Sequence, residues 1–468
     1  MNSAQQLNVA LIVLTCAAAS AAAQVFDVCE TAWLYPDQGA YDDAFGFAVA
    51  AEGDLAAIGA FRYDGVWDLS GGVFVYRVVA GQAEFETLLQ PPPDGLGLGK
   101  AIACSGERLL ARSMPLFLFE RVAGSWSITA TLWPEEPIGN IHFGNALAID
   151  GNLAVVGAPF GGPAFVFELQ QDRTWPEVAQ LYSSDFNPND NYGWDVDISG
   201  ETIVVGARDD DDFGWNSGSA YVFQRQGDGS WIETAKLVPH DGNTLAGFGG
   251  TVAIHGDEVV VGAQGAKLDD EIVGAVYVFR KHQTDGWIET QKLVAADAFQ
   301  PQNFGTAVDI TGNRLVIGAE QDDTHGPGSG CAYLFERGDD GAWWQLSKLA
   351  PEEGGPYDHA GKAVALGDDV ALIGAPDAEI HAPYSGCAYV FATGPDVNGN
   401  DIADPCECLA DINGDGVVGQ RDLGVLLSTY ELDSGSPLHD PRADVNNDGV
   451  IDQIDLSILL AEYEIVCP

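Results

Sequence analysis

"FGTAVDITGNRLVIGAE", residues 304–320, is one of several similar phrases in this chain. It alternates apolar and polar residues, passes through the short segment Thr311-Gly312-Asn313, and ends in a Val/Ile-rich run followed by Gly-Ala. Such alternation predicts a half-buried β-strand, and a short Gly-containing segment between two such runs predicts a tight hairpin turn. Related phrases begin at Tyr192 and at Phe248. The stretch therefore predicts a pair of antiparallel strands that recurs along the chain.

The recurrence amounts to seven units. The Gly-Ala pair of successive units begins at Gly59, Gly157, Gly206, Gly262, Gly318 and Gly374. The first gap is wide enough for two units, and "GLGKAIACSGERLLARS" from Gly97 keeps the alternation there. This copy is degenerate because Arg112-Ser113 stands where the others have Gly-Ala. Counting it gives seven.

Each unit predicts four strands. A third strand follows the Gly-Ala pair, as in "GSAYVF" from Gly218, and a fourth follows it, as in "WIETAKLV" from Trp231. Four short strands at a period of about 40 to 50 residues are typical of propeller blades, which bury their faces only by stacking. The fold class we predict is an all-β seven-bladed propeller, followed by a small α-helical module of EF-hand type.

The last unit lacks its fourth strand. Its third strand ends at Phe391, and the chain then continues into "ATGPDVNGNDIADP". The missing piece stands at the other end, where "CETAWLYP" from Cys29 matches "IETAKLVP" from Ile232. We therefore expect the N-terminal strand to complete the last blade and close the ring, which removes two exposed sheet edges.

The repeated phrases resemble FG-GAP repeats, the units of the integrin alpha-subunit propeller and of many bacterial secreted proteins. The resemblance covers roughly residues 28–391 and implies a seven-bladed propeller used for binding. Integrin-type repeats usually hold a calcium loop between the first and second strands. Here that position is a tight turn, as at Ser199, His255 and Thr311, and a turn of this length cannot surround a cation with six or seven oxygens. We expect no calcium in these turns.

Composition and the N-terminus indicate an exported protein. The 468 residues include 20 Lys+Arg and 70 Asp+Glu, a net charge of -50 that would repel nucleic acid and anionic membranes. An apolar run from Val9 followed by Ala21-Ala22-Ala23 predicts a signal peptide over residues 1–23, cleaved before Gln24. We expect no transmembrane segment in the mature chain, no nucleic-acid partner, and an extracellular location, secreted or at the cell surface.

The predicted propeller, residues 24–393, shows no constellation of catalytic residues. Its strongest local cluster is the acidic loop with Asp209 to Asp212 and the neighbouring Trp215, which could bind a cation or a basic partner but is more often a solvated charged loop. Loops with Asp269-Asp270 and Asp322-Asp323 suggest an acidic face. The tryptophans that open the fourth strands recur with the repeat and are expected to serve packing: Trp126, Trp175, Trp231, Trp287 and Trp343.

Two calcium loops are predicted in the C-terminal module, residues 409–468. A calcium loop of twelve residues places oxygen ligands at its first, third, fifth, seventh and twelfth positions, with glycine at the sixth. The first loop would use Asp411, Asn413, Asp415, Val417 (through its carbonyl) and Asp422. The second would use Asp444, Asn446, Asp448, Val450 (through its carbonyl), Asp452 (directly or through water) and Asp455. Calcium is therefore the expected cofactor.

One helix is expected after each loop. Leu423, Leu426, Leu427 and Tyr430 recur as Leu456, Leu459, Leu460 and Tyr463, a spacing that lets the two helices pack together. A duplicated loop with a helix on its far side resembles a dockerin, the calcium-dependent module that binds cohesin in cellulosomes. The resemblance covers about 60 residues and implies a cohesin-like partner.

The linker, residues 394–408, contains a possible third calcium loop. "DVNGNDIAD" resembles the calcium repeats of thrombospondin type 3. Its candidate ligands are Asp396, Asn398, Asn400, Ile402 (through its carbonyl) and Asp404.

The cysteines divide into two groups. Cys104, Cys331 and Cys387 occupy core positions of the repeat and are expected to be buried free thiols. Cys29, Cys406, Cys408 and Cys467 are the disulfide candidates. Cys467 is expected to pair with Cys406 or Cys408, Cys29 is the candidate partner of the other, and three connectivities stay open.

Three functions fit these features. The first is a non-enzymatic binding or adhesion protein that presents the propeller loops to a protein or glycan ligand and is carried on the docking module. The second is an extracellular carbohydrate-active or other hydrolytic enzyme, which would need a pair of carboxylates roughly 5 to 10 Å apart. The third is a structural matrix component. Whether the protein is an enzyme is left open here, and the absence of a catalytic motif favours binding.

Overall fold

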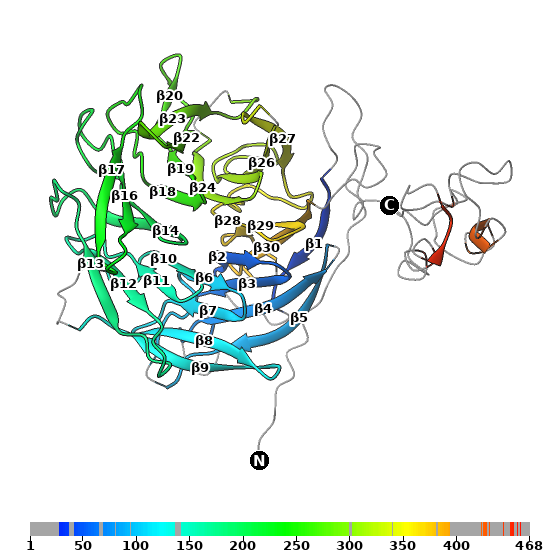
Figure 1. The fold of residues 1–468 in the computed structure, drawn as a ribbon. Coiled ribbons are helices and arrows are strands. Elements are labelled where there is room, and N and C mark those ends of the chain that lie inside the picture. The colour runs from blue at the N-terminus through cyan, green and yellow to red at the C-terminus, as the bar shows by residue number, and fades with distance from the viewer. Residues whose placement is uncertain are drawn as a thin grey trace.

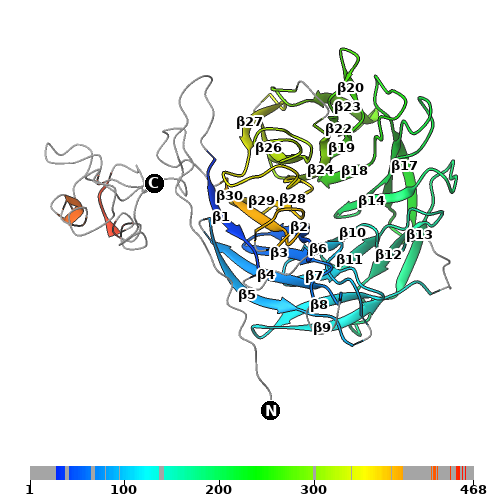
Figure 2. The same ribbon diagram turned by 180° about the vertical axis from the view of Figure 1, so that it is seen from behind.

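The computed structural model describes most of the chain before residue 394. It describes residues 28–36, 42–64, 69–79, 81–93, 95–135, 142–298, 302–338, 340–380 and 382–393, and isolated positions between 423 and 459. Seven four-stranded antiparallel sheets stand around a common axis, as Figure 1 shows. The first strand of each sheet lies nearest the axis and the fourth lies at the rim, and Figure 2 shows the same arrangement from behind. The predicted seven-bladed propeller is confirmed.

The strands have the following bounds in the first four blades. Blade 1 contains β2 (Phe45–Glu52), β3 (Leu55–Ala60), β4 (Gly72–Val79) and β5 (Gln82–Leu89). Blade 2 contains β6 (Ile102–Ser105), β7 (Arg108–Ala111), β8 (Leu116–Val122) and β9 (Ser125–Leu132). Blade 3 contains β10 (Leu147–Asp150), β11 (Leu153–Val156), β12 (Ala164–Glu168) and β13 (Glu177–Leu181). Blade 4 contains β14 (Tyr192–Ser199), β15 (Thr202–Ala207), β16 (Ser219–Arg225) and β17 (Trp231–Leu237).

The remaining blades follow the same order. Blade 5 contains β18 (Thr251–His255), β19 (Glu258–Ala263), β22 (Ala275–His282) and β23 (Gly286–Leu293), with a small hairpin of β20 (Lys267–Leu268) and β21 (Glu271–Ile272) at the rim. Blade 6 contains β24 (Phe304–Thr311), β25 (Arg314–Ala319), β26 (Cys331–Arg337) and β27 (Trp343–Leu349). Blade 7 contains β28 (Ala363–Leu366), β29 (Val370–Ala375), β30 (Cys387–Ala392) and β1 (Glu30–Leu34).

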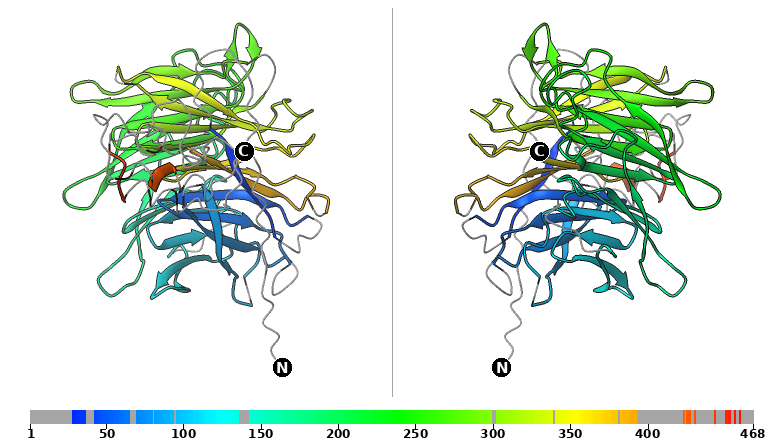
Figure 3. Two further views of the ribbon diagram at one scale, coloured as in Figure 1. Left: turned by 90° about the vertical axis from the view of Figure 1, so that its right-hand side faces the viewer. Right: turned by 90° about the vertical axis from the view of Figure 1, so that its left-hand side faces the viewer.

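The ring has two different faces. The first and second strands of a blade meet in a two-residue turn, such as Gly200–Glu201 between the paired residues Ser199 and Thr202. We call the side with these turns the turn face. The longer loops between second and third strands, and the connections between blades, lie on the opposite side, which we call the loop face. Figure 3 views the ring from its sides, where loops project from both faces.

The core lies between the blades. Seven clusters of buried apolar side chains are present, and each draws its members from two adjacent blades. The phenylalanine of the repeated Phe-Gly packs edge-on against an aromatic ring of the third strand, as in Phe304 and Tyr333, whose ring centroids are 5.5 Å apart. Trp343 is 1% exposed and its indole N–H donates to Glu258, which confirms a packing role for this tryptophan.

The signature glycines mark where neighbouring blades touch. A Cβ atom added to Gly206, in the Gly-Ala pair of blade 4, would lie 2.0 Å from the carbonyl oxygen of Gly249, in the Phe-Gly of blade 5. Only glycine permits two backbones to approach this closely. The same contact joins Gly59 to Gly99, Gly157 to Gly193, Gly262 to Gly305, Gly318 to Gly361, and Gly374 to Gly46. The glycines of the repeated phrase therefore allow the close backbone contact between neighbouring blades.

The N-terminal strand closes the ring, as predicted. β1 pairs antiparallel with β30, and Leu34 lies opposite Ala388. Leu34 is fully buried in a cluster that also contains side chains of blade 1. The Thr31 hydroxyl donates to the Gly81 carbonyl of blade 1 at 2.7 Å. β1 thus completes blade 7 and also contacts the blade beyond it.

A buried acid within β1 makes the closure pH-dependent. Glu30 is 3% exposed, and burial raises its pKa from 4.5 to about 7, with the charges of Glu352 and Glu353 acting in the same direction. One oxygen of the Glu30 carboxylate accepts a hydrogen bond from the Glu352 N–H at 2.9 Å, and this bond opposes the rise in pKa. Between these pKa values the folded chain holds a proton that the unfolded chain has lost. The stability contribution is therefore present below pH 4.5 and is lost as pH rises to about 7.

We expect Glu30→Gln to be more stable than the parent at pH 8, by on the order of 3 kcal/mol at 1.4 kcal/mol per pKa unit. The difference should shrink towards zero as the pH falls below 4.5, because the parent is then protonated in both states. Urea unfolding at the two pH values measures it. Glu201→Gln, at an exposed turn, is the matched control and should give no pH-dependent difference. Equal stabilities of Glu30→Gln and parent at pH 8 would contradict the assignment.

Candidate functional site

The acidic loop of blade 4 is partly a structural element. Asp210 is 4% exposed, and its carboxylate accepts hydrogen bonds from Tyr221 at 2.9 Å and from Lys236 at 3.2 Å. Asp211 and Asp212 are exposed, and Trp215 is exposed at 67%. Lys236 also pairs with Asp212 at 2.6 Å. A lysine thus holds two of these carboxylates, so part of this loop is ion-paired to its own blade and is not a simple solvated run.

The same lysine, Lys236, also belongs to a motif that repeats in three consecutive blades. An aspartate from the connection before each blade accepts from a third-strand tyrosine at 2.7 to 2.8 Å and from a fourth-strand lysine at 2.6 to 2.7 Å. The sets are Asp185, Tyr221 and Lys236, then Asp241, Tyr277 and Lys292, then Asp297, Tyr333 and Lys348. In each, the ammonium lies 5.3 Å from the tyrosine ring centroid. The motif joins each blade to the connection that precedes it.

In blade 6, as in blade 4, the fourth-strand lysine also pairs with a second aspartate, which lies in the loop between the second and third strands. Asp322 is 1% exposed and pairs with Lys348 at 2.8 Å. Burial by itself would raise the pKa of Asp322, but the hydrogen bonds from Lys348 and Thr324 hold it below its usual range. The Asp322-Asp323 pair therefore contributes less free negative charge to the loop face than its sequence suggests.

The axis of the ring opens on the loop face in a cavity of about 360 Å³. All seven blades line it, chiefly with the residue that follows the glycine of each Phe-Gly. We call this ring of seven residues the channel mouth. Its members are Phe47, Lys100, Asn145, Trp194, Gly250, Thr306 and Lys362. Several are tied to neighbours: the Asn145 amide donates to the Trp194 carbonyl at 2.9 Å, and the Thr306 hydroxyl accepts from Gln264 at 2.8 Å.

Three aspartates of the innermost strands carry raised pKa values. Burial raises the pKa of Asp195 and of Asp309 to about 6, and it raises that of Asp197 well above its usual range. Each carboxylate accepts a backbone N–H from the innermost strand of the next blade. The donors are Val252 for Asp195 at 2.8 Å, Ile254 for Asp197 at 2.7 Å and Leu366 for Asp309 at 2.7 Å. These acids satisfy the open inner edges of the neighbouring strands.

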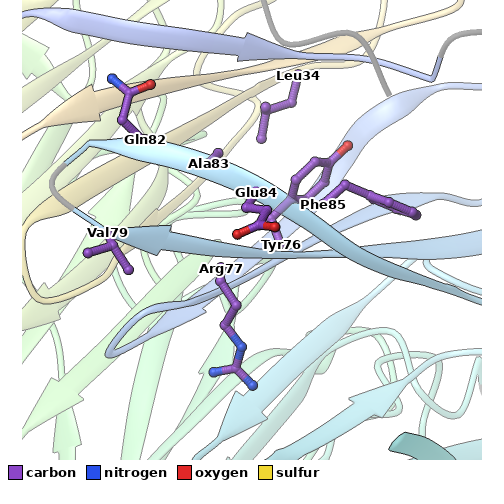
Figure 4. Close-up of a pocket in the computed structure, with 8 residues that line it drawn as sticks. All are labelled: Leu34, Tyr76, Arg77, Val79, Gln82, Ala83, Glu84 and Phe85. Carbon is purple, nitrogen blue, oxygen red and sulfur yellow. The ribbon is translucent and has the colours of Figure 1, made fainter. Parts of the chain in front are cut away.

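A second cavity of about 390 Å³ lies at the seam where the ring closes. Figure 4 shows Leu34 of β1 above the hairpin of β4 and β5, with Tyr76 pointing towards it. Ala83 and Phe85 line the same space, and Arg77 points away on the opposite side. Most of its lining is apolar, so this space is part of the packing between blades 7 and 1.

Most predicted calcium ligands lie outside the described residues. These are Asp411, Asn413, Asp415, Val417, Asp422, Asp444, Asn446, Asp448 and Asp455, and all five linker candidates, Asp396, Asn398, Asn400, Ile402 and Asp404. Val450 and Asp452 are described, the first exposed and the second half-buried. The donor set of the two loops, rich in carboxylates at alternate positions, is the one that calcium takes.

The described positions of the helices partly match the expected apolar stripe. Leu426 and Leu459 are helical and fully buried, as their equivalent places in the two halves predict. Leu427 differs, because its side chain is 53% exposed. Leu460 and Tyr463 lie outside the described residues.

The cysteines follow the expected division where the structure describes them. Cys104, Cys331 and Cys387 are free thiols, the last two fully buried and Cys104 half-buried, and burial raises the pKa of all three. Cys29 is disulfide-bonded. Its partner is none of these three, and Cys406, Cys408 and Cys467 lie outside the described residues.

Two histidines have carboxylate partners that the sequence did not reveal. His240 lies 2.5 Å from Glu289, and His359 lies 2.7 Å from Asp377. The hydrogen bond with Asp377 raises the pKa of His359. Each of these contacts holds one imidazole by one carboxylate.

Together these features define a seven-bladed β-propeller closed by its N-terminal strand and followed by a small module with two calcium-loop sequences. The FG-GAP repeat model matches residues 29–76, 175–223, 231–279, 287–335 and 343–391, more than half of the chain. The protein therefore belongs to the FG-GAP repeat family. The first match begins at β1, in the position where the other matches begin at a fourth strand. The Dockerin type I domain model matches residues 409–462.

Other comparisons add little about function. No curated protein matches the chain. Among solved structures, a chain of a mitotic checkpoint complex is 10% identical, with a TM-score of 0.49, and the alignment covers 81% of this chain and all of that one. A candidate 6-phosphogluconolactonase from Bacteroides uniformis is also 10% identical, with a TM-score of 0.46, covering 70% and 94%. Within the described part of the chain, no helix is long and apolar enough to span a membrane.

Proposed function

We propose that this protein is an extracellular binding protein whose propeller is anchored by a calcium-loaded dockerin module to a cohesin-bearing partner. The observation that carries the proposal is the Dockerin type I match over residues 409–462, joined to an FG-GAP propeller. Dockerin type I domains bind calcium, and this chain supplies two complete donor sets for it. The propeller is then the part delivered, and its loop face is the surface available to a protein or glycan ligand.

The calcium ions would be held by the two loops named above, through carboxylates, amides and one backbone carbonyl each. Such oxygen ligands converge only when a cation offsets their mutual repulsion, so binding and folding of the module are coupled. The third loop, in the linker, would use the five candidates from Asp396 to Asp404 in the same way. We also propose that Cys467 pairs with Cys406 or Cys408, and that Cys29 pairs with the remaining one.

A hydrolytic enzyme is the second candidate, and one observation favours it. Asp195, Asp197 and Asp309 line the innermost strands with raised pKa values, as a general acid would require. Their oxygens, however, accept backbone N–H groups of the next blade, which leaves less capacity for a substrate. Binding without turnover is the better-supported function. A polysaccharide screen that detects hydrolysis, lost in Asp197→Asn, would reverse this order.

Calcium removal should unfold the C-terminal module and leave the ring intact. Calorimetry of the full chain is expected to show a transition that disappears with EDTA and returns with calcium, beside one that EDTA does not shift. Capture by a panel of immobilised cohesins should depend on calcium in the same way. Asp415→Ala with Asp448→Ala should reproduce the EDTA result, whereas Asp433→Asn, an acid outside the loops, should not. An identical melting profile with and without calcium would refute the calcium assignment.

A further inference from the structure

The centre of the loop face differs in charge from the rest of the molecule. The chain carries 70 acidic and 20 basic residues. Yet the seven residues of the channel mouth include two lysines and no acid. Arg112 lines the same cavity, next to Lys100 of the same blade. In a protein with a net charge of -50, a basic centre inside an acidic surface is a local feature that needs its own cause.

Two of these cations have no counter-ion within the described part of the chain. Lys100 and Arg112 form no hydrogen bond or ion pair through their side chains with the residues that the structure describes. By contrast, Lys362 pairs with Glu320 at 2.6 Å, and Arg62 pairs with Asp42. Burial, and then the charges of Arg112 and Arg62, lower the pKa of Lys100, and burial lowers that of Arg112. The two charges repel each other and face an open cavity, an arrangement that an anion would relieve.

Arg112 also departs from the pattern of glycine contacts between blades. It occupies the place of the glycine that touches the next blade in the six other units. At this seam the three atoms nearest to a Cβ added at the next blade's Gly144 belong to side chains, those of Leu116 and of Arg112 itself. The substitution therefore replaces the glycine-to-glycine contact of the other six seams with a side-chain contact. A residue that departs from the repeat without improving the packing is expected at a functional position.

The cavity has the size and lining of a small-ligand site. Its volume of about 360 Å³ falls in the range of ligand pockets, from about 300 to 1,000 Å³. Alanines form much of its wall, and Asn145 and Thr306 add an amide and a hydroxyl. Asp195 also lines it, but its two oxygens accept the N–H groups of Val196 and Val252. A ligand with one anionic group and several hydroxyls matches this lining.

We propose that the channel mouth binds a sugar acid, with its carboxylate held by Lys100 and Arg112 and its hydroxyls by Asn145 and Thr306 elsewhere on the cavity wall. The planar guanidinium of an arginine matches a carboxylate through two parallel hydrogen bonds. The inference rests on the proposed function in one respect, that the ring is the binding part. It adds the site, the two anchoring side chains and the class of ligand.

Titration calorimetry of the full, calcium-loaded chain with glucuronate tests the proposal. We expect saturable binding, at least tenfold weaker in Arg112→Gly and in Lys100→Gln. Arg112→Gly restores the sequence of the other repeats, so it should keep the fold, which circular dichroism and the melting profile verify. Lys267→Gln is the matched control, because this lysine is exposed in the hairpin of β20 and β21, outside the cavity, and its replacement removes the same charge. It should change the affinity by less than twofold.

Two other probes separate the possible sources of binding. Glucose has the hydroxyls without the charge, and inorganic phosphate has the charge without the sugar; both should bind at least tenfold more weakly than glucuronate. Equal binding of glucose, or tighter binding of phosphate, would overturn the sugar-acid assignment. So would an absence of saturable glucuronate binding, or unchanged affinity in both variants. Cohesin capture by the same samples is independent of this site, so its failure would count against the docking proposal alone.

Discussion

Deletion of residues 28–36 should prevent the ring from folding as a stable monomer. The deletion removes the fourth strand of blade 7, including Leu34, which is fully buried. Loss of a buried leucine costs about 2 to 5 kcal/mol, and each lost backbone hydrogen bond costs about 1 kcal/mol more. The sum is of the order of the whole stability of a typical domain, about 5 to 15 kcal/mol. The deletion also leaves the edge of β30 unpaired, which invites association between chains.

Light scattering after gel filtration and calorimetry would measure the effect, with oligomers and a lost or broadened ring transition expected. Cys29→Ser is the first control, since it separates loss of the disulfide from loss of the strand. A circular permutant is the second: it begins at Asp42 and carries residues 28–36 on a short loop after Thr393. In that chain β1 becomes an ordinary fourth strand following β30, so folding should return. A deletion variant that stays monomeric and melts like the parent would refute closure by β1.

The repeat made the fold accessible from sequence. A strand pair such as β24 and β25 could be read from alternation, and the two-residue turns from their glycines. Because every unit repeats the same four strands, the missing fourth strand of the last unit pointed to its replacement at Cys29. The family match beginning at that residue gives the same register. The count of seven required accepting Arg112-Ser113 as a degenerate Gly-Ala pair, which blade 2 confirms.

Side-chain partners were less accessible, because they lie far apart in the sequence. Asp297 meets Tyr333 and Lys348 across sequence separations of 36 and 51 residues. The sequence shows only an acid in a loop, and its pairing depends on how the connection folds back on the blade that follows it. The recurrence of the same three residue types in blades 4 to 6 was the signal that could have predicted this motif.

The channel mouth shows the same limit. Arg112 appeared in the sequence only as a departure from the repeat, in the unit that seemed merely degenerate, and Lys100 only as one residue of that unit. Their closeness to residues of six other blades follows from closure of the ring. The calcium ligands, from Asp411 to Asp455 and in the linker, stay predictions from spacing alone.

Replacing Gly206 by alanine should destabilise the ring through one added methyl group. The new Cβ would stand 2.0 Å from the carbonyl oxygen and 3.0 Å from the carbonyl carbon of Gly249. Both atoms belong to the backbone of the next blade, so relief requires moving one blade against another. We expect the free energy of unfolding to fall by about 3 kcal/mol, a cost typical of overpacking a dense interior. Urea unfolding followed by tryptophan fluorescence measures it.

Gly227→Ala provides a control of opposite sign. Its Cβ would meet nothing within 4 Å, in the exposed turn between β16 and β17. There the substitution should stabilise slightly, by about 0.5 kcal/mol, because alanine restricts the unfolded chain. If Gly206→Ala behaved like Gly227→Ala, the seams would be loose and the signature glycines would have another purpose. The chain's own exception indicates otherwise: where Arg112 replaces the glycine, the atoms nearest to a Cβ added at the adjoining Gly144 belong to side chains, whereas a backbone atom comes nearest at the equivalent glycine of the six other seams.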